Sequence, residues 1–196
     1  MTNKIPSKST GALIAGLALL SAAPATGAQS AQPHGAQFSV LAGAISFKDT
    51  LQVGVGGEAQ LRFNRVRVSE NGVLSVGVGA QFTHHPFAAG QYFNITGAFL
   101  EPRYAFVVSS ERFFPYIAGR LAVLQQSSNV VASSLGYAAG GGGGIGFALS
   151  RSVNLDLGAA VLLQGFGNST TNTGKQPFEF KPFVGFATKL GLNFGF

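Results

Sequence analysis

The feature of this sequence that most limits its fold is an alternation of apolar residues with small or polar ones. In residues 183–196 (FVGFATKLGLNFGF) the even positions are bulky and apolar at six of seven places, and the odd positions are small or polar at six of seven places. Side chains alternate between the two faces of a β-strand, whereas a helix would mix the two sets. The segment is therefore predicted to be a strand with one apolar face.

The same period of two recurs in seven further segments, so that eight strands are predicted. It is clear in residues 51–63, 73–83 and 153–164, and weaker in residues 37–47, 94–107, 113–125 and 135–149. Polar connections alternate with short turns. The former are residues 48–50, 84–93, 127–134 and 167–176, and the latter are residues 70–72, 109–112 and 150–152. Long loops at one end and short turns at the other are typical of outer-membrane barrels.

The N-terminus has the pattern of a secretory signal peptide. Lys4 and Lys8 precede an apolar run at residues 12–20, and small residues follow. Nine apolar residues are too few to span a membrane as a helix, because about 20 are needed. We therefore predict a Sec-type signal peptide at residues 1–28, cleaved after Ala28 or Ala25, and a barrel domain at residues 29–196.

The rest of the chain has no apolar run long enough for a membrane helix, so any crossing would use strands. Only a closed barrel satisfies strand hydrogen bonds in lipid. Charged residues make up 10% of the chain, against about 25% in an ordinary soluble domain. We predict an all-β, eight-stranded antiparallel up-and-down transmembrane β-barrel. The formal charge of +6 forms no basic cluster, so no nucleic-acid partner is expected.

Seven charged residues fall on the small and polar faces of the predicted strands. They are Glu58, Arg62, Glu101, Arg103, Arg120, Asp156 and Lys189. An Arg or Lys facing lipid at mid-bilayer would cost about 2–4 kcal/mol, whereas in the lumen these groups can pair. Since the lumen of an eight-stranded barrel is narrow, we predict a salt-bridged plug at its centre.

Glycine and phenylalanine are both abundant, at 28 and 18 residues. We expect the glycines at crowded inward positions, and the phenylalanines on the lipid-facing surface and in girdles at its two edges. Pro102 lies within a predicted strand, where it removes a backbone donor, so we expect a weakened or bulged strand there.

Three segments resemble the family of small OmpA-like outer-membrane β-barrels. They are residues 114–119 (FPYIAG), residues 140–147 with 152–158, and the ending 190–196 (LGLNFGF). The resemblance implies a bacterial outer-membrane location in contact with lipid. It also implies that the last strand is an assembly signal for the barrel-assembly machinery, formed by Leu190, Leu192, Phe194 and Phe196.

The sequence leaves the function open between three classes. The first is a non-enzymatic outer-membrane barrel with an envelope structural, surface-interaction or weak pore role, whose loop at residues 168–173 could bind an unknown extracellular ligand. The second is a lipid-modifying enzyme that uses His84 or His85 with a loop serine, although no acid lies in either loop. The third is an exported soluble barrel that binds a small apolar ligand. We expect no catalytic residues, metal or cofactor.

Overall fold

The computed structural model describes residues 35–47, 50–69, 72–87, 90–108, 110, 112–172, 174 and 176–195. The predicted signal peptide and its cleavage sites lie outside these residues. The strands are β1 (Gly35–Phe47), β2 (Thr50–Ser69), β3 (Gly72–Pro86), β4 (Tyr92–Phe106), β5 (Phe113–Ser128), β6 (Ser134–Ala148), β7 (Val153–Phe166), β8 (Ser169–Thr170), β9 (Pro177–Phe178) and β10 (Phe183–Gly195). Within this part of the chain, no helix is long and apolar enough to cross a membrane.

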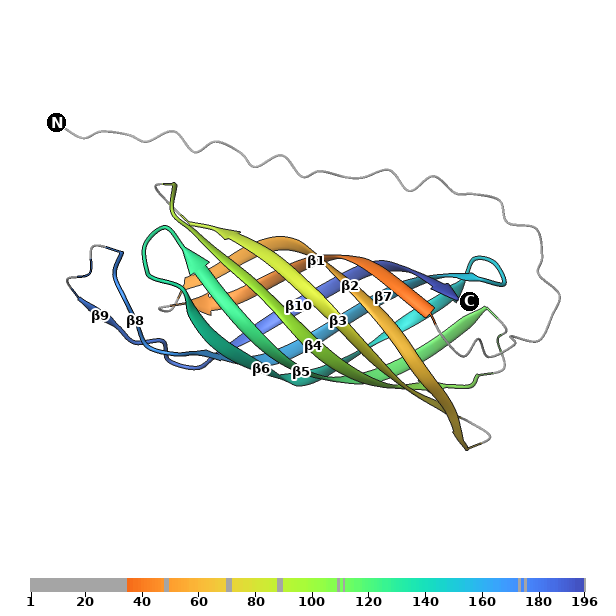
Figure 1. Cartoon of the computed structure of the whole chain (residues 1–196). Helices are drawn as coiled ribbons and strands as arrows, with labels where there is room; N and C mark the ends of the chain where they lie inside the picture. Colours follow the sequence, from red (N-terminus) through yellow and green to blue (C-terminus); the bar gives the residue numbers. More distant parts are fainter. Residues whose placement is uncertain are drawn as a thin grey trace.

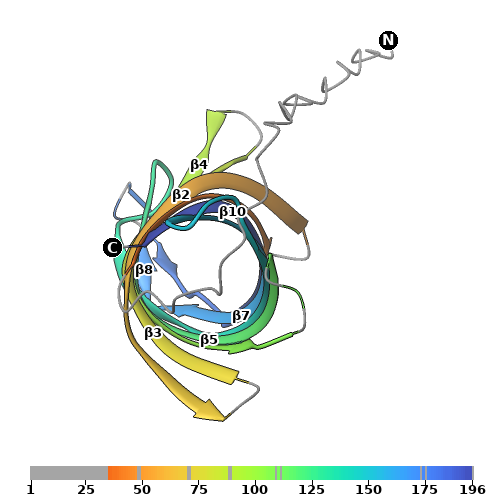
Figure 2. The ribbon, with the colours of Figure 1, turned by 90° about the vertical axis from the view of Figure 1, so that its right-hand side faces the viewer.

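Eight of the strands close into one antiparallel barrel in the order β1-β10-β7-β6-β5-β4-β3-β2 (Figures 1 and 2). The barrel closes where β1 pairs with β10, from Gly35↔Gly195 to Ile45↔Gly185. The predicted eight-stranded fold is confirmed. We call the end that carries the β3–β4, β5–β6 and β7–β10 connections the loop end, and the end that carries the β6–β7 turn the turn end.

The connection from β7 to β10 differs from the prediction. Residues 167–176 were expected to be a loop, but strands β8 and β9 form a small hairpin that lies beyond the barrel wall (Figure 1). Two-residue strands are too short for a period of two to be visible in the sequence.

Two strand irregularities also differ from the prediction. The register between β3 and β4 runs unbroken past Pro102, and β4 keeps one register on β5 before and after it. The register shifts lie instead in β2, between Phe63 and Val66 and between Arg67 and Ser69. Pro102 faces outward opposite Gly119 on β5, and a Cβ atom at Gly119 would lie 3.6 Å from its ring, an ordinary contact distance. No bulge forms at Pro102, so that alternative was wrong, but Glu101 and Pro102 have no ladder partner on β5, which fits the expected weakening of the strand.

The outer face of the barrel is apolar over most of its height. The exposed large side chains on it include Phe38, Val40, Val55, Leu61, Val78, Leu100, Leu121, Val123, Leu163, Phe186 and Leu190. The charged side chains of the middle of the strands are buried on the other face. An exterior of this kind would bind other apolar surfaces in water, but it suits hydrocarbon.

The lumen has two halves of different chemistry. The half toward the turn end contains the buried charged side chains, together with Gln37, Gln60, Ser75 and Asn193. The half toward the loop end contains an apolar cluster of Phe93, Ile95, Phe99, Ala122, Leu124, Val131, Ala138, Phe166 and Phe180. The prediction that phenylalanines face lipid is therefore wrong for these four, and also for Phe87 and Phe183, which pack against the cluster. The narrow lumen also needs bulky side chains where the facing strands carry glycine.

Glycines on β6 set the shape of the wall next to the charged half. A Cβ atom at Gly142 would clash with the Ala159 carbonyl and lie 2.6 Å from the Cα of Ala160. A Cβ atom at Gly144 would clash with the Tyr116 hydroxyl. Glycine at these two positions thus lets β6 approach β7 closely and leaves space for the tyrosine ring.

Candidate functional site

The structure places all seven predicted lumen charges inside the barrel, on five different strands. Glu58 and Arg62 come from β2, Glu101 and Arg103 from β4, Arg120 from β5, Asp156 from β7 and Lys189 from β10. Each ionised side chain is at most 10% exposed, and each has an ion-pair partner of opposite charge. The alternation of each strand turns these side chains inward, and the closed register brings them to one level of the lumen.

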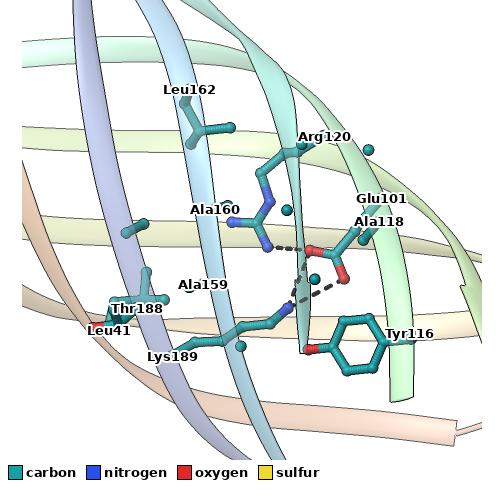
Figure 3. A pocket seen from close by; sticks show the side chains of 16 residues that line it. Leu41, Glu101, Tyr116, Ala118, Arg120, Ala159, Ala160, Leu162, Thr188 and Lys189 are labelled. Carbon is teal, nitrogen blue, oxygen red and sulfur yellow. Dashed lines mark hydrogen bonds and ion pairs between the residues drawn. The ribbon is translucent and has the colours of Figure 1, made fainter. Parts of the chain in front are cut away.

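Glu101 is the centre of this charge cluster. Its carboxylate accepts from Arg62 Nη2 at 2.8 Å and from Arg103 Nη2 at 3.0 Å. It also pairs with Arg120 and with Lys189 Nζ, the latter at 3.1 Å (Figure 3). Four cations thus share one buried carboxylate, so its removal would leave several positive charges close together in a site of low dielectric.

Asp156 is held by a cation and a phenol. Arg103 Nη1 donates to Asp156 Oδ2 at 2.6 Å, and the Tyr116 hydroxyl donates to Asp156 Oδ1 at 2.8 Å. The guanidinium carbon of Arg103 also lies 3.8 Å from the centroid of the Tyr116 ring. Tyr116 was not among the predicted site residues, although its inward position on β5 could have identified it.

Arg120 lies at the boundary between the two halves of the lumen. It pairs with Glu58 at 2.8 Å and donates through Nη1 to Gln81 Oε1 at 3.2 Å. Its guanidinium carbon also lies 4.0 Å from the centroid of the Phe99 ring, which belongs to the apolar cluster. The charged and apolar halves therefore meet in a cation–π contact between Arg120 and Phe99. The two side chains are too close for a water molecule to lie between them.

Hydrogen-bonded polar side chains adjoin the charge cluster. Arg62 Nη2 donates to Gln60 Oε1 at 3.0 Å, and Gln60 Nε2 donates to Gln37 Oε1 at 2.7 Å. Arg62 Nη1 reaches Ser75 Oγ at 3.2 Å. These contacts fill the lumen next to the charge cluster with hydrogen-bonded side chains.

A small cavity of about 30 Å³ lies beside the charge cluster (Figure 3). Among the residues that line it are Glu101, Arg120, Lys189, Leu41 and Leu162. A cavity needs roughly 10–15 Å³ to hold a water molecule, so this one has room for one or two. It is too small for an organic substrate.

The apolar cluster closes the loop end of the lumen. The rings of Phe93, Phe166 and Phe180 lie 5.7–5.9 Å from one another, measured between centroids. Phe93 and Phe166 belong to barrel strands, whereas Phe180 belongs to the segment between β9 and β10. A side chain from a loop thus completes the packing of the barrel mouth, which the strand pattern alone could not predict.

The two histidines point to opposite sides of the wall. His84 is on the outer face, where Nδ1 lies 2.7 Å from Asn94 Oδ1 and the ring lies against Tyr92. His85 faces the lumen and is 2% exposed, with Nε2 at 3.1 Å from Thr83 Oγ1. The side-chain hydrogen-bond partners of the two rings are thus an amide and a threonine hydroxyl, not a serine or a carboxylate. Among the described residues, no group of three His, Asp or Glu side chains could hold a metal ion.

Three of the four predicted assembly-signal residues are described. Leu190, Leu192 and Phe194 are exposed on the outer face of β10, and Phe194 packs edge-on against Phe38 of β1. Phe196 lies outside the described residues. The apolar face of the last strand is therefore accessible, but its role in assembly stays a prediction.

An apolar exterior around a polar, charged interior is typical of membrane-spanning β-barrels. The crystal structure of Neisserial surface protein A (NspA) matches with a TM-score of 0.65 and 16% sequence identity, over 84% of this chain and 97% of that chain. The chain thus has the fold of the small outer-membrane β-barrels, as the resemblance in the sequence predicted.

Two further structures are more distant. The N-terminal barrel domain of Pseudomonas aeruginosa OprF has a TM-score of 0.44 and 12% identity, over 82% of this chain and 97% of that chain. Yersinia pestis Ail, the attachment invasion locus protein, has a TM-score of 0.44 and 12% identity, over 83% and 97%. No protein-family model and no curated protein sequence matches the chain.

Proposed function

We propose that the protein is a non-enzymatic barrel of the bacterial outer membrane that presents its loop end at the cell surface and does not form an open pore. The observation that supports this most is the filled lumen. The charge cluster occupies one half and the apolar cluster occupies the other, so two different barriers lie in series. The barrel then serves as a stable support for its surface loops, either structurally or by binding a partner.

The surface loops are joined to one another in a way that suits display. Asn129 Nδ2 donates to Gly90 O at 3.0 Å, and Asn129 Oδ1 accepts from Tyr92 N at 3.1 Å. Ala132 N donates to Thr170 O at 2.9 Å, and Asn172 N donates to Val130 O at 2.9 Å. Three connections therefore form one ordered surface, which is the part of the protein that an extracellular ligand would meet.

Cysteine labelling tests the location and the orientation together. The chain has no cysteine, so Thr170→Cys on β8 and Ser152→Cys in the β6–β7 turn each introduce a single thiol. In intact cells, a membrane-impermeant maleimide should label the first variant, and should label the second only after the outer membrane is permeabilised. Equal labelling of both in intact cells, or recovery of the protein without detergent, would contradict the proposal.

No observation of the site favours the enzymatic alternative, and one experiment separates it. If His84 or His85 acted on lipid, replacing both with alanine would change the lipid A profile of the cells. We expect an unchanged profile.

The assembly role of the last strand is a separate proposal. Deletion of Phe196 should lower the amount of folded barrel and raise periplasmic aggregate, whereas deletion of the same number of residues from the 168–173 loop should not.

A further inference from the structure

The buried charges of the lumen do not balance. The charge cluster contains four cations and three carboxylates, which leaves a net charge of +1. Among the described residues, the one other carboxylate side chain is Glu179, which is exposed in the β9–β10 connection. The polar side chains buried near the cluster are neutral amides and hydroxyls, among them Gln37, Gln60, Ser75 and Asn193. A buried charge without a counter-charge is costly, so the lumen lacks one negative charge.

The cluster also has hydrogen-bond donors to spare. In the described part of the chain, Nε of Arg62 and Nε of Arg103 are buried without a hydrogen-bond partner. Glu58 Oε2 is the one buried carboxylate oxygen in the same position, and it already lies 2.8 Å from Arg120 Nη2 in an ion pair. The three carboxylates thus leave the cluster with surplus positive charge and with unpaired N–H groups. An anion is the kind of group that the cluster as a whole lacks.

The small cavity lies between the charge cluster and a part of the wall that is made of small residues. Arg120 and Lys189 line it, and their head groups approach the Glu101 carboxylate from two sides (Figure 3). A Cβ atom at Gly158 would lie 3.0 Å from Lys189 Cε, so glycine there leaves space beside the lysine. Further small residues line the cavity from β5, β6, β7 and β10, among them Ala118, Gly142, Ala160 and Ala187. Its volume of about 30 Å³ suits a monatomic ion or one or two water molecules.

From the charge surplus and the cavity we propose that the barrel binds one halide ion, chloride in the cell, beside Lys189 and Arg120. The ion brings the net charge of the cluster to zero. Glu101 also lines the cavity, but four cations contact its carboxylate, so the charge that surrounds the cavity is positive. Phosphate and sulfate are too large for this cavity. A water molecule fits it and accepts a hydrogen bond but leaves the charge, so water is the occupant that the experiments must distinguish from a halide.

Replacement of the anion at constant ionic strength tests the site in the native protein. The protein is unfolded by urea in lipid vesicles, because urea adds no halide, while sodium gluconate is replaced stepwise by sodium chloride. A ligand that binds only the folded state lowers the unfolding equilibrium constant. We expect that constant to fall about tenfold when chloride reaches about ten times its dissociation constant. The same unfolding midpoint in gluconate and in chloride would overturn the proposal.

Matched lysine variants locate the effect. Lys189→Gln leaves three cations beside three carboxylates, so the cluster is neutral without an ion and unfolding should no longer depend on chloride. Lys181→Gln removes an exposed lysine from the β9–β10 connection and should keep the chloride response of the native protein. A chloride response of native size in Lys189→Gln would assign the effect to exposed charges and would also overturn the proposal.

A second measurement needs no variant, in case Lys189→Gln does not fold. The native protein is refolded and crystallised with bromide as the sole halide, and diffraction is recorded at the bromine absorption edge. We expect an anomalous peak in the cavity beside Lys189 and Arg120. Density in the cavity without anomalous signal would identify water as the occupant and contradict halide binding. Anomalous peaks confined to the surface of the barrel would contradict it as well.

Discussion

The two halves of the lumen solve the same packing problem with opposite chemistry. In the half toward the turn end, four cations and three carboxylates bind one another, and every partner comes from a barrel strand. In the half toward the loop end, aromatic and aliphatic side chains pack without charge, and two of them, Val131 and Phe180, come from loops. The charged half needs all of its ionised side chains, because removal of one leaves its partner as an unpaired buried charge. The apolar half can lose one side chain and relax around the space that remains, so a truncation there leaves no unpaired charge.

The largest effect should follow from loss of the central carboxylate in the charged half. Glu101→Gln leaves four cations beside only two acids, and removal of one partner from a buried ion pair costs about 3–5 kcal/mol. We expect this loss in the free energy of unfolding, measured by urea titration in lipid vesicles. An unchanged unfolding midpoint would mean that the cluster is hydrated and does not act as a unit.

A truncation in the apolar half should cost less and should not depend on charge. Leu124 belongs to the apolar cluster and is 1% exposed. A buried Leu→Ala change costs about 3 kcal/mol through lost burial and the cavity that remains. The same vesicle titration should show that this loss is independent of salt concentration. A strong salt dependence for Leu124→Ala would blur the distinction between the two halves.

A smaller effect should separate the hydrogen bond of Tyr116 from its ring. Tyr116→Phe removes the donor to Asp156 but keeps the ring beside Arg103, and a hydrogen bond to a charged group contributes about 2 kcal/mol. We expect an intermediate loss in unfolding free energy. If Tyr116→Phe cost as much as Glu101→Gln, the carboxylate of Asp156 would be the true centre of the cluster.

The smallest effect should come from a charge outside both halves. Lys181 is exposed next to Phe180, and exposed substitutions usually change stability by less than about 0.5 kcal/mol. Lys181→Gln should therefore unfold like the native protein in the same titration. It serves as the control for residues 179–182, because a loss of more than about 1 kcal/mol would show that this segment is held by charge and not by the packing of Phe180.

The sequence predicted the barrel wall well, because a period of two is a local property that each strand carries in its own residues. The inward position of Lys189 follows from its place in residues 183–196, and the same holds for the other six lumen charges. The exact pairing could not be predicted. That Glu101 meets four cations depends on the register of strands far apart in the chain, which alternation alone does not fix.

The apolar half of the lumen was missed for a related reason. Phe93, Ile95 and Phe99 alternate as well as any lipid-facing set does, so their pattern shows that they share a face but not which face is inside. Phe180 was missed because it belongs to no strand. Its position depends on the length of the β7–β10 connection and on the space left between Phe93 and Phe166.

Planar-bilayer conductance of the refolded native protein at neutral pH tests most directly whether the two halves of the lumen seal it. Because the charge cluster and the apolar cluster lie in series, we expect a current no greater than that of a protein-free bilayer. Heat-modifiable mobility of the same sample would confirm that the barrel is folded and inserted. A sustained open-channel current from that sample would contradict the sealed lumen and, with it, the proposed role as a closed support for surface loops.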